Sequence, residues 1–371
     1  MNVPLLDLVA QYRTIKEEVS SALQRVVESQ QFIMGPAVLQ LETAVAQLSH
    51  ARHGVGCASG TDALLLPLKA LNLKPGDEVI TSSFTFFATA GAIHNAGGTP
   101  VFVDIEADTF NIDPEAVAAA ITPRTRAIVP VHLFGQMANM ERLLAIARRH
   151  GLKVIEDACQ AIGARRSIDG EWRMAGELGW VTAYSFFPSK NLGAWGDAGM
   201  MVTSDDAVAE RLRRLRLHGG AKQYHHDEIG TNSRLDTLQA AVLLAKLPHL
   251  AAWSGQRREH ATYYSKAFAG LEGVTTPIVD RANEHIFHQY TVRAQRRDQL
   301  QAHLKANGIG CAVYYPIPLH RQECFAHLGY EEGRLPVSER AAREVLSLPI
   351  FPELTREQQD AVVGAVREFY R

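Results

Sequence analysis

Between Pro75 and Phe187 the chain alternates between short apolar runs and runs of helical length. The apolar runs, among them EVIT, PVFV, AIVPV, KVIE and VTAYSFF, are rich in β-branched and aromatic residues, as strands are. This alternation is typical of βαβ units, whose strands form a mostly parallel sheet buried under helices on both faces. The sequence therefore predicts an α/β fold.

The alternation stops near Trp253. Beyond it we expect a mixture of strands and helices: strands at Gln289–Ala294 and Ala312–Ile317, a helix at Arg297–Asn307, and a last helix opened by a capping box at Thr355–Gln358. A chain of 371 residues is long enough for two domains. We predict a large domain at residues 1–250, including two N-terminal helices, and a smaller α+β domain at residues 251–371.

Composition excludes several functional classes. The 38 basic and 40 acidic residues nearly cancel, which argues against a nucleic-acid or membrane surface. The four cysteines form no CxxC pair, and His225-His226 has no third ligand at suitable spacing, so we predict neither a disulfide framework nor a metal site. No apolar run approaches the ~18 residues of a spanning helix, and the N-terminus does not resemble a signal peptide. We expect a cytoplasmic protein without membrane insertion.

Reactive residues follow the predicted strands, at the edge where parallel sheets bind ligands. Asp157 and Gln160 come after one strand, Phe86 after another, and Lys190 after a third, in a turn rich in glycine. A lysine presented from a strand end is suited to covalent work on a carbonyl group. The alternatives without catalysis are that Lys190 is an ordinary surface lysine, or that it only forms a salt bridge with Asp157.

Gly54, Gly56 and Gly60 match the pattern GxGxxxG. A dinucleotide fingerprint requires a good strand before its first glycine, which this chain does not predict, so an NAD enzyme is only an alternative. We expect a short strand from Val55 and a helix that begins near Gly60-Thr61. Free backbone N–H groups at such a helix start bind phosphate, and simple N-capping there is compatible with this.

Two further helices are expected after the glycine-rich turn. One carries four arginines, from Arg211 to Arg216, and we predict that they form a solvated basic face. The other is apolar from Leu238 onward, with Asn232 and Ser233 as its expected caps.

A lysine nucleophile, an aspartate, a phosphate cradle and a stacking aromatic together indicate pyridoxal phosphate. The lysine would form the Schiff base. The aspartate would keep the pyridine nitrogen protonated, which makes the ring an electron sink. Helix-start N–H groups and hydroxyls would hold the phosphate, and the aromatic side chain would pack on the ring.

Seven segments of the chain then occur in a familiar order: GTDAL (60–64), TSSFTFFAT (81–89), VPVHLFGQ (129–136), EDACQAIGA (156–164), SFFPSKNLGAWGDAG (185–199), GTNSRLDTLQAA (230–241) and YYPIPLH (314–320). In them the chain resembles the DegT/DnrJ/EryC1/StrS family of pyridoxal-phosphate sugar aminotransferases over nearly its whole length. The resemblance implies the type I aminotransferase fold.

The resemblance also implies roles for single residues. Lys190 would be the Schiff-base lysine, Asp157 the partner of the pyridine nitrogen, Gln160 that of the ring hydroxyl, and Phe86 the stacking aromatic. The implied phosphate contacts are Gly60, Thr61, Ser185 and, from a second subunit, Asn232, which predicts a homodimer with shared active sites. The implied sugar-nucleotide contacts are Arg234, Tyr315 and His320.

The implied reaction moves an amino group from glutamate to a keto sugar nucleotide. Within the family, the chain is most similar to enzymes acting on UDP-2-acetamido-2-deoxy-3-oxo-glucuronate for O-antigen synthesis. The alternatives are a dTDP-linked 3-keto deoxysugar, a 4-keto sugar nucleotide, and a non-catalytic regulator. Two positions depart from the family pattern: Ala198 stands where glycine is usual and is expected to narrow the pocket, and Tyr314 stands where histidine is common.

Overall fold

The computed structural model describes residues 2–222 and 224–371. Its central sheet has seven strands in the order β1-β9-β8-β5-β4-β2-β3. Their bounds are β1 His53–Cys57, β2 Glu78–Ser82, β3 Thr99–Val103, β4 Thr125–Val129, β5 Lys153–Asp157, β8 Val181–Ser185 and β9 Gly199–Thr203. Strand β9 runs antiparallel to both neighbours and the other adjacent pairs are parallel, so the predicted α/β fold with a mostly parallel sheet is confirmed.

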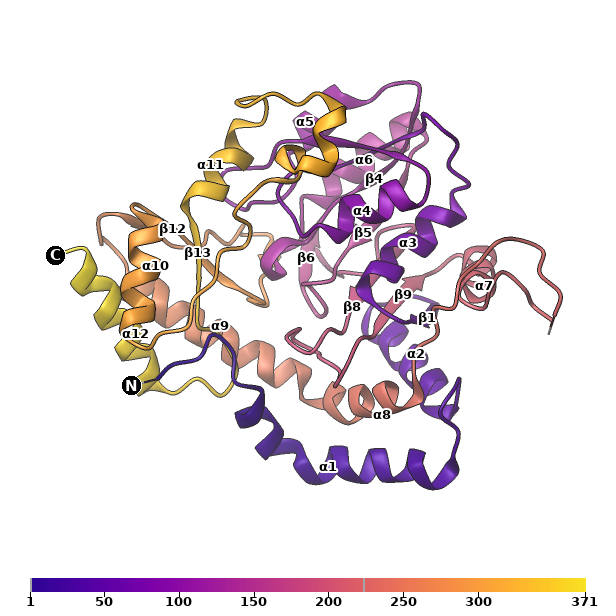
Figure 1. The fold of residues 1–371 in the computed structure, drawn as a ribbon, viewed down its shortest axis with the longest axis horizontal. Helices are drawn as coiled ribbons and strands as arrows, with labels where there is room; N and C mark the ends of the chain where they lie inside the picture. The colour runs from indigo at the N-terminus through magenta and orange to yellow at the C-terminus, as the bar shows by residue number, and fades with distance from the viewer. Residues whose placement is uncertain (1, 223) are drawn as a thin grey trace.

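Helices cover both faces of this sheet (Figure 1). One face packs on α3 Gly60–Ala70, α4 Ala88–Asn95 and α7 Asp206–Leu215, and the other on α2 Pro36–Leu48, α5 Pro114–Ala120, α6 Met140–His150 and α8 Thr237–Lys246. Successive strand residues such as Val154 and Ile155 enter opposite cores. Since both faces are buried, the strands must be apolar along their whole length, and this is the pattern that the sequence displays.

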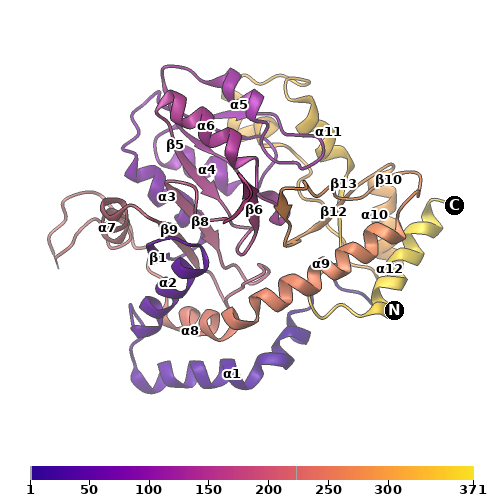
Figure 2. The same ribbon diagram turned by 180° about the vertical axis from the view of Figure 1, so that it is seen from behind.

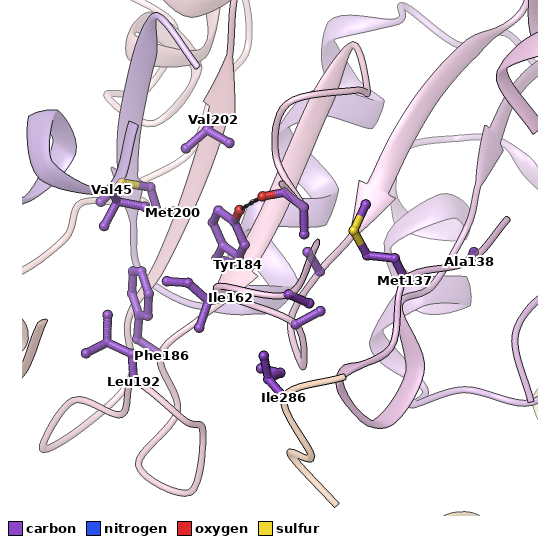
Figure 3. Packing of buried hydrophobic residues seen from close by; sticks show 14 of the residues in the cluster. Val45, Met137, Ala138, Ile162, Tyr184, Phe186, Leu192, Met200, Val202 and Ile286 are labelled. Carbon is purple, nitrogen blue, oxygen red and sulfur yellow. Dashed lines mark hydrogen bonds between the residues drawn. The ribbon is translucent and has the colours of Figure 1, made fainter. Parts of the chain in front are cut away.

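Tyr184 of β8 is the largest side chain at the centre of one core (Figure 3). Figure 3 shows its ring among Ile162, Phe186, Met200 and Val202. Its buried hydroxyl has hydrogen-bond partners, because it donates to the backbone oxygen of Ala175 and contacts Ser49 Oγ. Strand β8 is thus fixed immediately before the turn that carries Lys190.

The second part of the fold has its own core. Its elements are α9 Leu250–Ala267, β10 Val274–Thr275, β12 Tyr290–Ala294, α10 Arg297–Ala306, α11 Pro336–Glu344, β13 Val345–Leu348 and α12 Arg356–Phe369, and β10-β12-β13 form a sheet. The capping box predicted at Thr355–Gln358 is present. We keep the division at residue 250 as a proposal.

An N-terminal strap, residues 2–6, also joins this second core. Val3 is fully buried there and forms a parallel bridge with Ile309. Gly310 makes room for the strap, since a Cβ atom there would lie 2.5 Å from the Leu5 nitrogen. Both chain ends therefore lie at one end of the molecule (Figures 1 and 2). Helix α1, Leu8–Ser29, then returns along α8, burying Ile15 and Val19.

Two expectations about elements were wrong, and one hairpin was missed. Residues 312–317 form no strand; only Ala312 pairs, with Ser347, and the prolines at 316 and 318 cannot donate to a ladder. A hairpin was missed, β6 Arg165–Ile168 and β7 Glu171–Met174, which pairs further with β11 Asn283–Glu284. Arg216 is not solvated: it is buried and forms a 2.5 Å ion pair with Glu42.

In the described part of the chain, the remaining helical elements are four short 3-10 turns: η1 Leu133–Gly135, η2 Leu247–His249, η3 Leu319–Arg321 and η4 Glu323–Leu328. Across the residues that the structure describes, none of the helices has both the length and the apolar character needed to cross a membrane.

Candidate active site

Lys190 lies in a tight turn that follows β8. Its N–H donates to the Phe187 oxygen at 2.8 Å, and the Ala194 N–H returns to the Phe186 oxygen at 2.8 Å. Gly193 is required here, because a Cβ atom at that position would collide with the Pro188 oxygen. Lys246 of α8 also holds the turn, because its Nζ donates to the Gly193 oxygen at 2.5 Å. The turn is therefore anchored, and Lys190 is presented from a fixed backbone.

Lys246 gives a testable dependence of stability on pH. Burial lowers the pKa of Lys246 to about 8, although the Glu353 carboxylate opposes this. Between that value and the ~10.4 of an unfolded lysine, the unfolded chain holds a proton that the folded chain has lost. The free energy of unfolding should therefore rise with pH across this window, by roughly 3 kcal/mol from this group.

Lys246→Met lacks this titration. The difference in unfolding free energy, wild type minus Lys246→Met, should therefore rise between about pH 8 and about pH 10.4. Urea unfolding at a series of pH values measures it. Lys266→Met, which replaces an exposed lysine of α9, is measured in parallel as the control for removing a lysine. A difference for Lys246→Met that does not rise across this window, or rises no more than that for Lys266→Met, would contradict the prediction.

Asp157 ends β5 and faces the same pocket as Lys190. It is 5% exposed, and both carboxylate oxygens accept hydrogen bonds: Oδ2 from Thr89 Oγ1 at 2.8 Å and Oδ1 from the Cys159 N–H at 3.2 Å. Its direct partners are thus Thr89 and Cys159, and the carboxylate is held in place without a plain salt bridge to Lys190.

The amine of Lys190 is tuned toward its neutral form. Burial lowers the pKa of this amine, while the nearby Cys159 and Asp157 partly oppose the shift. A neutral amine is the nucleophilic form, so a lowered pKa raises the reactive fraction near neutral pH. Its surroundings therefore favour covalent chemistry with a carbonyl group.

The start of α3 forms a cradle opposite Lys190. Ser59 caps the helix, accepting from the Asp62 N–H at 3.1 Å, and Gly60 and Thr61 line the pocket together with Ser185. A Cβ atom on Gly60 would lie 2.5 Å from the Ser185 Cβ, so only glycine lets the helix start come this close. Capping and a phosphate-sized anion site therefore coexist here, as expected of an exposed helix N-terminus beside a hydroxyl.

Aromatic and amide groups form the remaining wall. Phe86 lines the pocket although 57% of it is exposed, which leaves a face for a ligand ring to cover. The Tyr315 ring lies 6.2 Å from it. Gln160 accepts from the Phe134 N–H at 2.7 Å and donates from Nε2 to the Tyr315 hydroxyl at 3.0 Å, keeping a second Nε2 hydrogen available.

These groups fit pyridoxal phosphate. The anion cradle at Gly60, Thr61 and Ser185 matches the phosphate, the exposed face of Phe86 matches the ring, and the buried Asp157 carboxylate matches a ring cation. A dinucleotide is a poorer match. Gly54 and Gly56 lie within β1, where a Cβ would meet the Glu42 backbone and the Leu235 side chain, so they serve packing.

Not all predicted residues meet at this pocket. Asn232, Arg234 and Tyr315 do not line it, although Tyr315 bonds Gln160, which does. Nor do Asn232 and Ser233 cap a helix: α8 begins at Thr237, and Asn232 is extended because its backbone pairs with Leu217. Ser233 instead donates to the Asp62 carboxylate at 2.7 Å.

Two other expectations change with the structure. His320 is 1% exposed, and its ring nitrogens contact Ser83 Oγ at 2.5 Å and Glu339 Oε1 at 3.1 Å, so it ties α11 to the end of β2. Ala198 was expected to narrow the pocket, but its methyl group belongs to the core between the sheet and the helices α2 and α8. Tyr314 is partly buried against the cluster that contains Phe84 and Val345.

Sequence reasoning missed Thr89 and Cys159, which hold the Asp157 carboxylate. Cys159 stands between Asp157 and Gln160 in sequence, and this spacing is the only signal that could have indicated it. Thr89 lies in α4, far from Asp157 in sequence, and only the fold brings the two together.

Comparison with known proteins gives a consistent result. The model of the DegT/DnrJ/EryC1/StrS aminotransferase family matches residues 13–367. A crystal structure of DesV from S. venezuelae, in complex with a ketimine intermediate, has a TM-score of 0.96 and 46% identity, covering 100% of this chain and 99% of that one.

Three curated relatives match over almost their full length. A pleiotropic regulatory protein of Geobacillus stearothermophilus is 55% identical, covering 100% of this chain and 99% of the relative. The UDP-N-acetyl-3-dehydro-alpha-D-glucosamine 3-aminotransferase of Acidithiobacillus ferrooxidans is 47% identical, with coverages of 98% and 97%. The UDP-2-acetamido-2-deoxy-3-oxo-D-glucuronate aminotransferase of Pseudomonas aeruginosa is 44% identical, with coverages of 95% and 96%.

Proposed function

Because the chain belongs to the DegT/DnrJ/EryC1/StrS family and is a sugar aminotransferase that uses pyridoxal phosphate, we propose that it transfers an amino group from glutamate to a UDP-linked 3-keto sugar. The observation that carries the aminotransferase chemistry is the convergence of Lys190, Asp157 and the Gly60–Ser185 cradle on one pocket. The choice of sugar rests on the relatives. We propose that the product serves O-antigen synthesis in the cytoplasm.

In the proposed reaction the bound cofactor supplies an electron sink, and the protein handles charge and protons. Lys190 would hold the cofactor covalently, and its amine, when free, would act as the base and acid that moves a proton at the substrate carbon. Asp157, held by Thr89 and Cys159, would keep the ring nitrogen protonated. Gly60, Thr61 and Ser185 would bind the phosphate, Phe86 would pack on the ring, and Gln160 would bond its hydroxyl.

The proposed sugar is of the UDP-2-acetamido-2-deoxy-3-oxo-glucuronate type. Two relatives at 47% and 44% identity are named for UDP-linked 3-keto substrates, which supports the class. We propose Arg234 as the partner of the sugar carboxylate, with Tyr315 near the sugar. Since His320 is buried and bonded on both nitrogens, we propose that it supports the Tyr315 segment instead of touching the sugar.

The runner-up is a dTDP-linked 3-keto deoxysugar or a 4-keto sugar nucleotide; a relative 46% identical is named for a dTDP-3-amino sugar. The test is to offer the purified enzyme UDP-3-keto, dTDP-3-keto and 4-keto sugars with glutamate as donor. Preferred turnover of the UDP-3-keto glucuronate supports our proposal, and turnover of only 4-keto sugars refutes it. A protein that binds pyridoxal phosphate but turns over no sugar would favour a regulator, as the name of one relative suggests.

We further propose a homodimer with shared active sites, in which Asn232 reaches the cofactor phosphate of the partner subunit. Asn232 is exposed and does not line the pocket of its own chain, which supports this. Asn232→Ala should weaken cofactor binding by about tenfold, the effect of one lost hydrogen bond to a charged group. Equilibrium titration with pyridoxal phosphate measures it.

Mixing two defective variants tests the sharing directly. A hybrid of Asn232→Ala and Lys190→Ala subunits would hold one complete site, so random mixing should restore about a quarter of wild-type activity per subunit. The control pairs Asn232→Ala with the double variant Lys190→Ala/Asn232→Ala, which keeps the residual activity of the Asn232→Ala subunits but can form no complete site. Both mixtures are assayed at a pyridoxal phosphate concentration that leaves Asn232→Ala sites largely empty. If the first mixture recovers no more than this control, the shared-site proposal fails.

A further inference from the structure

A junction segment, residues 285–289, leads into β12 and is hydrogen-bonded to η1 and to the turn that carries Lys190. On one side, its Ile286 N–H donates to the Gly135 oxygen at 3.0 Å. On the other side it meets Asn191, the residue directly after Lys190: Asn191 Nδ2 donates to the Ile286 oxygen at 3.2 Å, and Asn191 Oδ1 lies 3.1 Å from His288 Nδ1. The Lys190 turn is thereby bonded to the junction segment.

The hydrogen bonds determine the tautomer of His288. Asn191 uses its Nδ2 as a donor to a backbone oxygen, so its Oδ1 must be the acceptor toward the histidine. His288 Nδ1 therefore carries the hydrogen. Asn191 and His288 are 5% and 6% exposed, so water does not compete effectively for this bond.

Burial and the charges around His288 both favour its neutral form. Burial lowers the pKa of His288 well below its usual value, and the positive charges of Lys190 and Arg257, together with His285, lower it further. Arg257 of α9 also fixes the segment, since its Nη1 donates to the Phe287, His288 and Ile350 oxygens. A protonated imidazole here would place a buried cation near Arg257 and the turn that carries Lys190.

We propose that His288 is a positioning residue for the transamination: as a neutral, Nδ1-protonated imidazole it holds Asn191, and so fixes the turn that presents Lys190. The proposal rests on the role of Lys190 in the proposed function. It distinguishes His288 from His285 in the same segment, whose Nδ1 accepts from the Phe287 N–H at 2.9 Å and whose ring stacks on Phe287.

The test compares three variants of the holoenzyme. His288→Leu removes the donor to Asn191, His288→Asn keeps a donor near the Nδ1 position, and His285→Leu removes a buried histidine that does not bond the Lys190 turn. Three quantities are measured for each: kcat and KM, the pH midpoint of the visible absorption of bound pyridoxal phosphate, and the thermal unfolding midpoint.

For His288→Leu we expect kcat to fall about 10- to 100-fold, as for a misplaced reacting group, with KM nearly unchanged. The absorption midpoint should shift by about half a pH unit or more, since it reports the surroundings of the lysine nitrogen. His288→Asn should restore both quantities, and His285→Leu should lower the unfolding midpoint without moving either.

The proposal is overturned if His288→Leu leaves kcat and the absorption midpoint as in the wild type, or if His285→Leu changes them equally. If His288→Leu does not fold, Asn191→Ala replaces it and should show the same two changes. A wild-type protein that binds no pyridoxal phosphate would overturn the proposed function itself, whereas a normal wild type with an unaffected variant overturns only the role of His288.

Discussion

Lys190→Ala is expected to abolish transamination, by at least about 10⁴-fold in kcat/KM, while the fold survives. The chemical reason is that alanine offers neither the covalent link to the cofactor nor the amine that moves the proton. The fold should survive because the turn is held by backbone bonds and by Lys246, none of which uses the Lys190 side chain. Removing a buried amine whose charge is disfavoured should not lower stability.

Turnover with glutamate, the visible absorption of the bound cofactor and the thermal unfolding midpoint together measure this. Lys190→Arg is the matched control for charge, because arginine keeps the cation but cannot act as the amine nucleophile. It should be as inactive as the alanine variant. Turnover within tenfold of the wild type in either variant would remove Lys190 from the centre of the mechanism.

Asp157→Asn should lower kcat by about 10²- to 10⁴-fold, the range of a lost proton-controlling group. The substitution removes the negative charge of the carboxylate but keeps the shape of the side chain. The asparagine Oδ1 can still accept from the Cys159 N–H, and the Thr89 hydroxyl can rotate to accept from Nδ2 where it formerly donated. What disappears is the negative charge that keeps the ring nitrogen protonated.

Thr89→Val provides a graded comparison, since it removes one hydrogen bond to Asp157 and keeps the charge. We expect Thr89→Val to lower kcat roughly tenfold, the effect of losing one hydrogen bond to a charged group. Presteady-state measurement of the glutamate half-reaction checks both variants. A loss for Asp157→Asn no larger than that for Thr89→Val would show that the charge is not the essential property.

Much of the fold was predictable because it is encoded locally. The apolar strand runs such as KVIE can only be buried on both faces, and Pro36, Thr355 and Gln358 mark helix starts by their own chemistry. The hairpin over residues 165–174 was missed although Asp169-Gly170, both with positive φ, is a strong two-residue turn signal. The burial of Arg216 was not predictable, because its partner Glu42 lies in another helix.

In the candidate site, too, the locally encoded residues were predictable and those that depend on tertiary contacts were not. The strand-end rule indicated Asp157 and Lys190, and the helix-start rule indicated Gly60, because each depends on a few neighbouring residues. Thr89 and His288 depend on tertiary contacts with Asp157 and Asn191, 68 and 97 residues away in sequence. His320 was assigned by resemblance to a sugar contact, and only the packed structure gives both of its nitrogens partners inside the protein.

The N-terminal strap has a consequence for the order of folding during synthesis. Val3 is synthesised well before its partners Gly308, Ile309 and Gly310, which stand far later in the sequence. Because the central sheet needs only residues before 204, it can assemble while the strap is still unpaired. Burial of Val3 is therefore a late step, and a nascent chain stopped before residue 308 should leave the strap open to proteolysis.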